Sequence, residues 1–143
     1  MHLHIGLRVG DIARSTDFYS AFFGREPDKL RPGYARFTLD EPALVLGMTE
    51  DPALRNVART EEPTHHFGLR LTDPERVAAA GDRLERAGLS PVPESDTVCC
   101  WARQEKFWAH DPDGHAWEVY CVLDDSPPVA SQPACCVPGA DCS

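Results

Sequence analysis

The sequence predicts an α+β fold built from two βαβββ modules. The first observation is an internal repeat: HIGLRVGDIAR, residues 4–14, and HFGLRLTDPER, residues 66–76, share six identical positions at a constant offset of 62 residues. Each copy begins with an apolar run typical of a strand and then reaches an aspartate that can cap a helix. Short runs of β-type residues follow each predicted helix.

In the first module, either Asp11 or Ser15 can cap a helix that ends at Gly24. The runs YARFTL, residues 34–39, and ALVLGM, residues 43–48, are the strands expected after it. The helix should turn its apolar side chains inward, namely Ile12, Tyr19, Phe22 and Phe23.

In the second module, Asp73 is a good N-cap and Pro74 fits the first helical position. The helix should end at Gly88, and its buried stripe comprises Val77, Ala80, Leu84 and Ala87. Three β-type runs follow, TVCCWAR, KFWAH and AWEVYCV. Because DPDG, residues 111–114, has the composition of a tight turn, the last two runs should pair as a hairpin.

A chain of 143 residues suits one compact domain. We expect a single domain over residues 1–123, with modules near 2–50 and 64–123. The tail, residues 124–143, is rich in Pro, Ser, Ala and Asp and has no periodic apolar face, which predicts flexibility. The sequence leaves open whether the modules pair within one chain or by exchange in a homodimer.

Composition excludes several classes of function. The net charge of -9, with no Lys/Arg cluster, opposes binding to nucleic acid. No run approaches the roughly 20 apolar residues that span a bilayer, so no membrane partner is expected. The N-terminus lacks the pattern of a secretory leader, which makes the cytoplasm the default location. In that reducing compartment the six cysteines should remain thiols.

The repeat singles out His4 and His66 as candidate metal ligands. Two histidines at equivalent positions can face each other when duplicated modules pair around a pseudo-twofold axis. The alternative is that each is an ordinary surface or strand-end residue. The neighbouring His2 and His65 fall outside the repeated positions and should lie in solvent.

Glu118 completes the candidate set. It lies inside the apolar run Ala116 to Tyr120, where an unpaired buried carboxylate would be costly, so it needs a partner or a metal. Alternatively, it faces solvent from the sheet. With His4 and His66 it forms a set of two imidazoles and one carboxylate, which would be both the metal ligands and the catalytic centre. Such a set suits Fe(II) with open positions for O₂ and substrate, although zinc, nickel or manganese also fit.

Cys99 and Cys100 form a candidate thiol site. A disulfide between neighbours would be strained, so free thiols are expected, and two thiolates together favour trivalent arsenic, Cd(II) or Cu(I). The alternative is that successive strand residues face opposite sides of the sheet, unless a bulge or strand end intervenes. Cys121 is expected in the core without a chemical role, and Phe107, Trp101 and Tyr34 are candidate aromatic walls of the site.

These residues carry a resemblance that runs nearly end to end. The segments HIGLRVGDIARSTDFYSAFFG, RPGYARF, HHFGLRL, TVCCWARQEKFWAHDPDG, AWEVY and the tail ACC resemble the vicinal-oxygen-chelate superfamily of glyoxalases, bleomycin-resistance proteins and dioxygenases. Within it, CCWARQEKFW followed by DPDG and WEVY resembles the ArsI C–As lyases and the related cadmium-induced proteins. The resemblance implies a cup-shaped mixed sheet around a metal site.

The resemblance assigns metal ligation to His4, His66 and Glu118 and binding of the substrate arsenic to Cys99 and Cys100. In such lyases Fe(II) and O₂ cleave the carbon–arsenic bond of trivalent organoarsenicals such as methylarsenite, giving arsenite. Two other functions stay open. One is a thiol-based arsenic- or cadmium-sequestering protein, to which the tail thiols Cys135, Cys136 and Cys142 could contribute. The other is a glyoxalase-type enzyme or drug-binding resistance protein of the same fold.

Overall fold

The computed structural model describes residues 2–55, 66–99 and 102–125. The chain packs into two compact units: Met1–Thr60 together with Asp111–Gly114, and Glu61–His110 together with His115–Ser143. Apart from the turn at Asp111–Gly114, this division follows the two predicted modules. No helix within the described ranges is long and apolar enough to cross a bilayer. The single domain expected over residues 1–123 stays a prediction.

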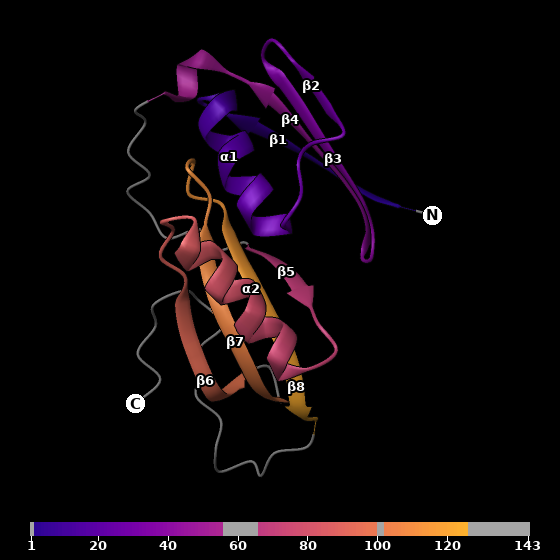
Figure 1. Ribbon diagram of the computed structural model, residues 1–143, viewed down its shortest axis with the longest axis vertical. Coiled ribbons are helices and arrows are strands. Elements are labelled where there is room, and N and C mark those ends of the chain that lie inside the picture. Colours follow the sequence, from indigo (N-terminus) through magenta and orange to yellow (C-terminus); the bar gives the residue numbers. More distant parts are fainter. Residues whose placement is uncertain (1, 56–65, 100–101, 126–143) are drawn as a thin grey trace. The chain divides into compact units, whose positions relative to one another are not determined.

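The first unit contains a four-stranded sheet and one α-helix (Figure 1). Its strand order is β1-β4-β3-β2, with β1 parallel to β4 and the other neighbours antiparallel. The elements are β1 (Leu3–Val9), α1 (Ile12–Phe23), β2 (Lys29–Arg31), β3 (Tyr34–Asp40), β4 (Ala43–Glu50) and the short 3-10 helix η1 (Pro52–Leu54).

Helix α1 packs against β3 and β4 and closes the core of the first unit. Asp11 is the N-cap, because its side chain accepts a hydrogen bond from the backbone N–H of Arg14 at 3.0 Å. Gly24 ends the helix at φ 67°, in the left-handed region that glycine adopts without strain. Both predicted ends are therefore confirmed, whereas the alternative cap, Ser15, is buried inside the helix. The aromatic core comprises Phe18, Tyr19, Phe22 and Phe37.

The second unit repeats this topology. Its sheet has the order β5-β8-β7-β6, with β5 parallel to β8 and the other neighbours antiparallel. Helix α2 packs against β7 and β8 (Figure 1). The elements are β5 (His66–Arg70), α2 (Pro74–Arg86), β6 (Val92–Cys99), β7 (Ala102–His110) and β8 (Ala116–Asp124). The predicted pair of βαβββ modules is thereby confirmed.

Helix α2 begins as predicted, with the Asp73 side chain accepting the backbone N–H of Arg76 at 2.9 Å and Pro74 in the first turn. Of the expected stripe, Ala87 is exposed, because the helix ends at Arg86 and the chain turns away at Gly88, φ 76°. The buried members are Val77, Ala80 and Leu84.

Two strand predictions need correction. The run TVCCWAR is not one strand: β6 ends at Cys99 and β7 begins at Ala102, and these two residues pair in an antiparallel ladder. No glycine or proline marks this reversal, which is why the run appears continuous in the sequence. Strand β2 was missed because Lys29–Arg31 is exposed throughout and has no alternating apolar pattern.

The DPDG turn between β7 and β8 carries two aspartates that bind residues of the first unit, to which the turn belongs. The buried Tyr19 hydroxyl donates to Asp111 Oδ2 at 2.8 Å, and the backbone N–H of Gly10 donates to Asp113 Oδ1 at 2.8 Å. The turn itself is closed by the Gly114 N–H, which donates to the Asp111 carbonyl at 2.9 Å. The predicted turn and the pairing of its flanking strands are confirmed.

Candidate metal and thiol site

The register of the second sheet decides which way Glu118 faces. Glu118 lies between Gly68 of β5 and Trp108 of β7. The residue before Trp108, Phe107, points to the opposite face, where it lies against Gly81 of α2. Glu118 therefore faces away from the helix. The expectation that Phe107 forms a wall of the site is wrong, because alternation puts it on the other side of the sheet.

His66 and Glu118 lie together on the face of the sheet that is turned away from α2. His66 Nε2 is 3.6 Å from Glu118 Oε2, and their side chains are 30% and 12% exposed. The His66 ring also meets Trp108 edge-on, with ring centroids 5.0 Å apart. Two of the three predicted ligands, His66 and Glu118, thus lie next to each other in the second unit.

The ion-pair partner of Glu118 is Lys106, which was not among the predicted site residues. Its side chain is 1% exposed, and its Nζ lies 3.2 Å from Glu118 Oε1 and 3.2 Å from Glu94 Oε2. The Trp108 Nε1 donates to Glu94 Oε1 at 3.2 Å, and its ring lies 5.3 Å from the ammonium. This network compensates the burial of Glu118 by binding one of its oxygens, while the other oxygen faces His66.

The signal for Lys106 was present in the sequence. KFWAH and AWEVYCV flank a tight turn, so counting outward from that turn pairs Trp108 with Glu118 and Lys106 with Tyr120. A lysine in an apolar strand, diagonal to a glutamate in the next strand, indicates a buried ion pair. Lys106 is therefore the partner that the buried Glu118 carboxylate was expected to need.

His4 is an exposed residue of β1 in the first unit. Its Nε2 and the Tyr34 hydroxyl flank Gly47 of β4: a Cβ built there would lie 3.4 Å from the first and 3.6 Å from the second. Its neighbour His2 is also exposed and lies 3.7 Å from Asp40. Among the residues that the structure describes, no three His, Cys, Asp or Glu side chains form a cluster that could hold a metal.

Of the predicted thiol pair, the structure describes only the backbone of Cys99. Cys99 is the last residue of β6 and pairs with Ala102 of β7. The orientation of the two thiols stays a prediction. Cys100, Trp101 and the tail residues Cys135, Cys136 and Cys142 lie outside the described ranges.

Cys121 is a core residue, as predicted. It is 1% exposed and lies three residues after Glu118 in the same strand, so its side chain is on the opposite face, which α2 covers. Burial raises the pKa of the Cys121 thiol, which keeps it protonated and disfavours metal binding.

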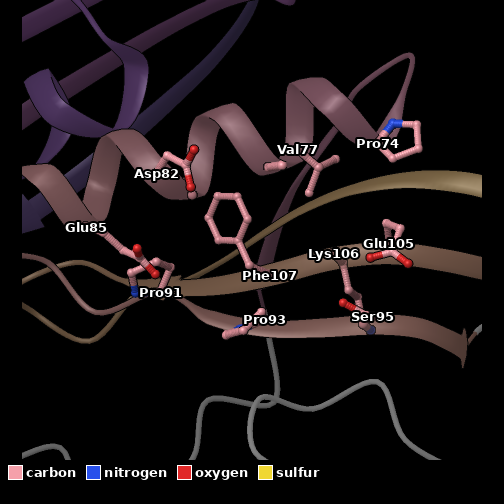
Figure 2. A pocket seen from close by; sticks show the side chains of 12 residues that line it. Pro74, Val77, Asp82, Glu85, Pro91, Pro93, Ser95, Glu105, Lys106 and Phe107 are labelled. Atoms are coloured by element: carbon pink, nitrogen blue, oxygen red, sulfur yellow. The ribbon is translucent and has the colours of Figure 1, made fainter.

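A cavity in the second unit lies away from the predicted site. It has a volume of about 190 Å³ and lies between α2, β6 and β7, with Phe107, Asp82 and Glu85 among the residues that line it (Figure 2). Neither His66 nor Glu118 lines it. Its lining joins residues of α2, such as Val77 and Gly81, to Pro93 and Ser95 of β6.

Comparison with known proteins decides the family. The pattern of the Glyoxalase/Bleomycin resistance protein/Dioxygenase superfamily matches residues 2–119, which run from β1 into β8 and include all three candidate ligands. The chain belongs to this superfamily. The predicted vicinal-oxygen-chelate fold is thereby confirmed, since this superfamily member has two modules of identical topology.

Several relatives are similar to this superfamily member over most of their length. A "Trivalent organoarsenical cleaving enzyme" from Thermomonospora curvata is 40% identical and covers 98% of this chain and 97% of the relative. A "Cadmium-induced protein CadI" from Mycobacterium bovis is 38% identical and covers 92% of this chain and 82% of the relative. These matches extend the likeness well beyond the fold.

Solved structures agree on the architecture. A "glyoxalase-related enzyme" from Fulvimarina pelagi has a TM-score of 0.64 at 25% identity, covering 85% of this chain and 87% of that one. A glyoxalase/bleomycin resistance protein/dioxygenase from Alicyclobacillus acidocaldarius has a TM-score of 0.67 at 16% identity, covering 87% of this chain and 93% of that one. At such low identity the second likeness shows the fold alone.

Proposed function

We propose that this protein cleaves the carbon–arsenic bond of trivalent organoarsenicals such as methylarsenite and releases arsenite. The observation that carries this proposal is the near end-to-end similarity to proteins named as trivalent organoarsenical cleaving enzymes, at 40% identity over 98% of this chain for the Thermomonospora curvata relative. Cys99 and Cys100 support it, because two neighbouring thiolates form a chelating pair for a soft trivalent arsenic atom.

The residues present suit a divalent metal. His66 Nε2 and Glu118 Oε2 approach within 3.6 Å, and this oxygen is not the one that Lys106 binds. The repeat and the family match support His4 as the third ligand. Two imidazoles and one carboxylate suit Fe(II), which when bound would supply the open positions and one-electron chemistry that O₂ requires.

The protein's own side chains position the ligands and the substrate. Lys106 holds one oxygen of Glu118, which fixes the carboxylate and directs its other oxygen toward His66. The edge-on contact with Trp108 restricts rotation of the His66 ring. The thiolates of Cys99 and Cys100 would replace two oxygen ligands of the arsenical and hold its carbon substituent in one orientation.

The proposed reaction balances with O₂ as the only oxidant. Methylarsenous acid and one O₂ contain the atoms of arsenous acid and formaldehyde, so no external reductant is needed. The carbon–arsenic bond breaks, the methyl carbon is oxidised, and arsenic remains trivalent. Formaldehyde and arsenite should therefore appear in equal amounts.

The decisive experiment is anaerobic reconstitution with Fe(II), followed by methylarsenite and then O₂, with arsenite measured by chromatography and formaldehyde by derivatisation. Turnover should require both Fe(II) and O₂. The variants C99S and C100S should each lose turnover, whereas a triple C135S/C136S/C142S variant serves as a thiol-removal control and should retain it. Bound but uncleaved methylarsenite in the fully reconstituted protein would contradict the proposal.

Similarity to the cadmium-induced proteins favours one alternative, a protein that sequesters soft metals on its thiols. Glu118→Ala separates the two functions, because a lyase should lose turnover while still binding methylarsenite, whereas a sequestering protein should be unchanged. Glu85→Gln, an exposed glutamate on α2, is the matched control. Full turnover in the Glu118→Ala protein would refute the role given to that carboxylate.

A further inference from the structure

Glu94 contacts both side chains that in turn contact the candidate ligands of the second unit. It lies on the edge strand β6, directly opposite Lys106 of β7, and its side chain is 19% exposed. One of its oxygens meets the Lys106 ammonium, and the other accepts a hydrogen bond from the Trp108 indole. Lys106 contacts Glu118, and Trp108 contacts His66. A single carboxylate is thus connected to both ligands.

The first connection runs through the buried ammonium of Lys106. Its Nζ lies 3.2 Å from Glu94 Oε2 and 3.2 Å from Glu118 Oε1, and the lysine side chain is 1% exposed. A buried ammonium needs acceptors for its three N–H donors, because water cannot reach them. Glu94 therefore holds the ammonium between the two carboxylates. Without Glu94, the ammonium could turn toward both oxygens of Glu118 and compete with a metal for the oxygen that faces His66.

The second connection runs through the indole of Trp108. Trp108 is 1% exposed, and its Nε1 donates to Glu94 Oε1 at 3.2 Å. The indole has one N–H donor, which is costly to bury without an acceptor, so this hydrogen bond sets the rotation of the ring. The ring meets the His66 imidazole at an interplanar angle of 82°, with centroids 5.0 Å apart. Rotation of the indole would therefore remove the contact that restricts His66.

Charge neutralisation alone does not explain Glu94. Glu118 would suffice to pair with the Lys106 ammonium, so the second carboxylate adds a negative charge that this ammonium does not compensate. Such a surplus is unfavourable among side chains that are at most 19% exposed, unless a further cation is bound. A metal ion on His66 and Glu118 would be such a cation. The surplus charge therefore fits a metal centre better than a structural ion pair.

We propose that Glu94 is a positioning residue of the metal centre and acts on both candidate ligands of the second unit. It orients Glu118 through the ammonium and His66 through the indole. Glu94 is not itself a ligand, because one of its oxygens is bound by the ammonium and the other by the indole. This inference rests on the proposed function, since it requires a metal on the two ligands.

The test compares Glu94→Ala, which removes both connections, with Glu94→Gln, whose side-chain carbonyl can still accept the indole hydrogen bond. Glu85→Gln, an exposed glutamate on α2 of the same unit, is the matched control. The affinity for Fe(II) is measured without oxygen by competition with a chromophoric chelator. We expect both Glu94 variants to bind Fe(II) roughly tenfold more weakly than wild type. The control should match wild type.

A second measurement, on the metal-free protein, follows the His66 ring by nuclear magnetic resonance. The nearby indole displaces the ring-proton resonances of His66, which are assigned with His66→Gln. In Glu94→Ala they should move toward the values of an unstructured histidine, because the indole loses its acceptor. In Glu94→Gln they should stay near wild type. A structural role alone would not produce this difference between two folded variants.

If Glu94→Ala folds by circular dichroism and binds Fe(II) within about twofold of Glu85→Gln, the inference is overturned, even if the variant unfolds more easily in urea. Unchanged His66 resonances in Glu94→Ala likewise overturn it. In both cases the proposed function survives, provided that wild type binds Fe(II) and releases arsenite. If wild type does neither, both proposals fail. Should Glu94→Ala not fold, Glu94→Gln is judged by the same limit on Fe(II) affinity.

Discussion

Replacing Lys106 by methionine should destabilise the protein strongly. The lysine side chain is 1% exposed, and removing it leaves Glu118 and Glu94, which are 12% and 19% exposed, without their shared cation. Breaking a buried ion pair by removing one partner typically costs about 3–5 kcal/mol. Because both carboxylates retain some access to water, we expect the lower end, about 3 kcal/mol of unfolding free energy.

Urea unfolding followed by tryptophan fluorescence in a chelating, metal-free buffer measures this change. For a slope of about 1–3 kcal/mol per molar, the midpoint should fall by roughly 1–3 M. Lys29→Met is the matched control, because Lys29 is exposed and should cost no more than about 0.5 kcal/mol. The double variant K106M/E118Q should recover part of the loss. A Lys106→Met protein within about 1 kcal/mol of wild type, with no recovery in the double variant, would refute the reasoning.

Three further outcomes follow from local contacts. Tyr19→Phe, which removes the buried donor to Asp111, should lower the unfolding free energy by about 1–3 kcal/mol in urea titrations. Gly24→Ala, at φ 67°, should cost about 1 kcal/mol in the same assay. The hydrogen bond from the Arg76 backbone N–H lowers the pKa of Asp73. The ionised Asp73 cap therefore stabilises the folded protein above the ordinary carboxyl pKa of about 3.9, and this stabilisation is lost as pH falls through the lower folded-state pKa. The melting-temperature gap between wild type and Asp73→Asn should therefore close in acid.

Much of the fold could be predicted because both copies of the sequence repeat predict the same order of strand and helix. Capping chemistry predicts where both helices begin, at Asp11 and Asp73. Turn composition predicts the β7–β8 hairpin. The β6–β7 hairpin could not be predicted, since Cys99 and Ala102 lie in a run without glycine or proline. Local composition thus predicted the helices and the turns that contain glycine or proline. It did not predict the chain reversal between β6 and β7, which only the pairing of these strands shows.

The candidate site divides in the same way. His66 and Glu118 could be predicted because each is a chemically conspicuous residue in an apolar strand. Lys106 required the register of β7 against β8, because nothing in its own strand marks it as the partner of Glu118. A buried carboxylate in the sequence therefore indicates that a partner exists, whereas only the pairing of the strands identifies that partner.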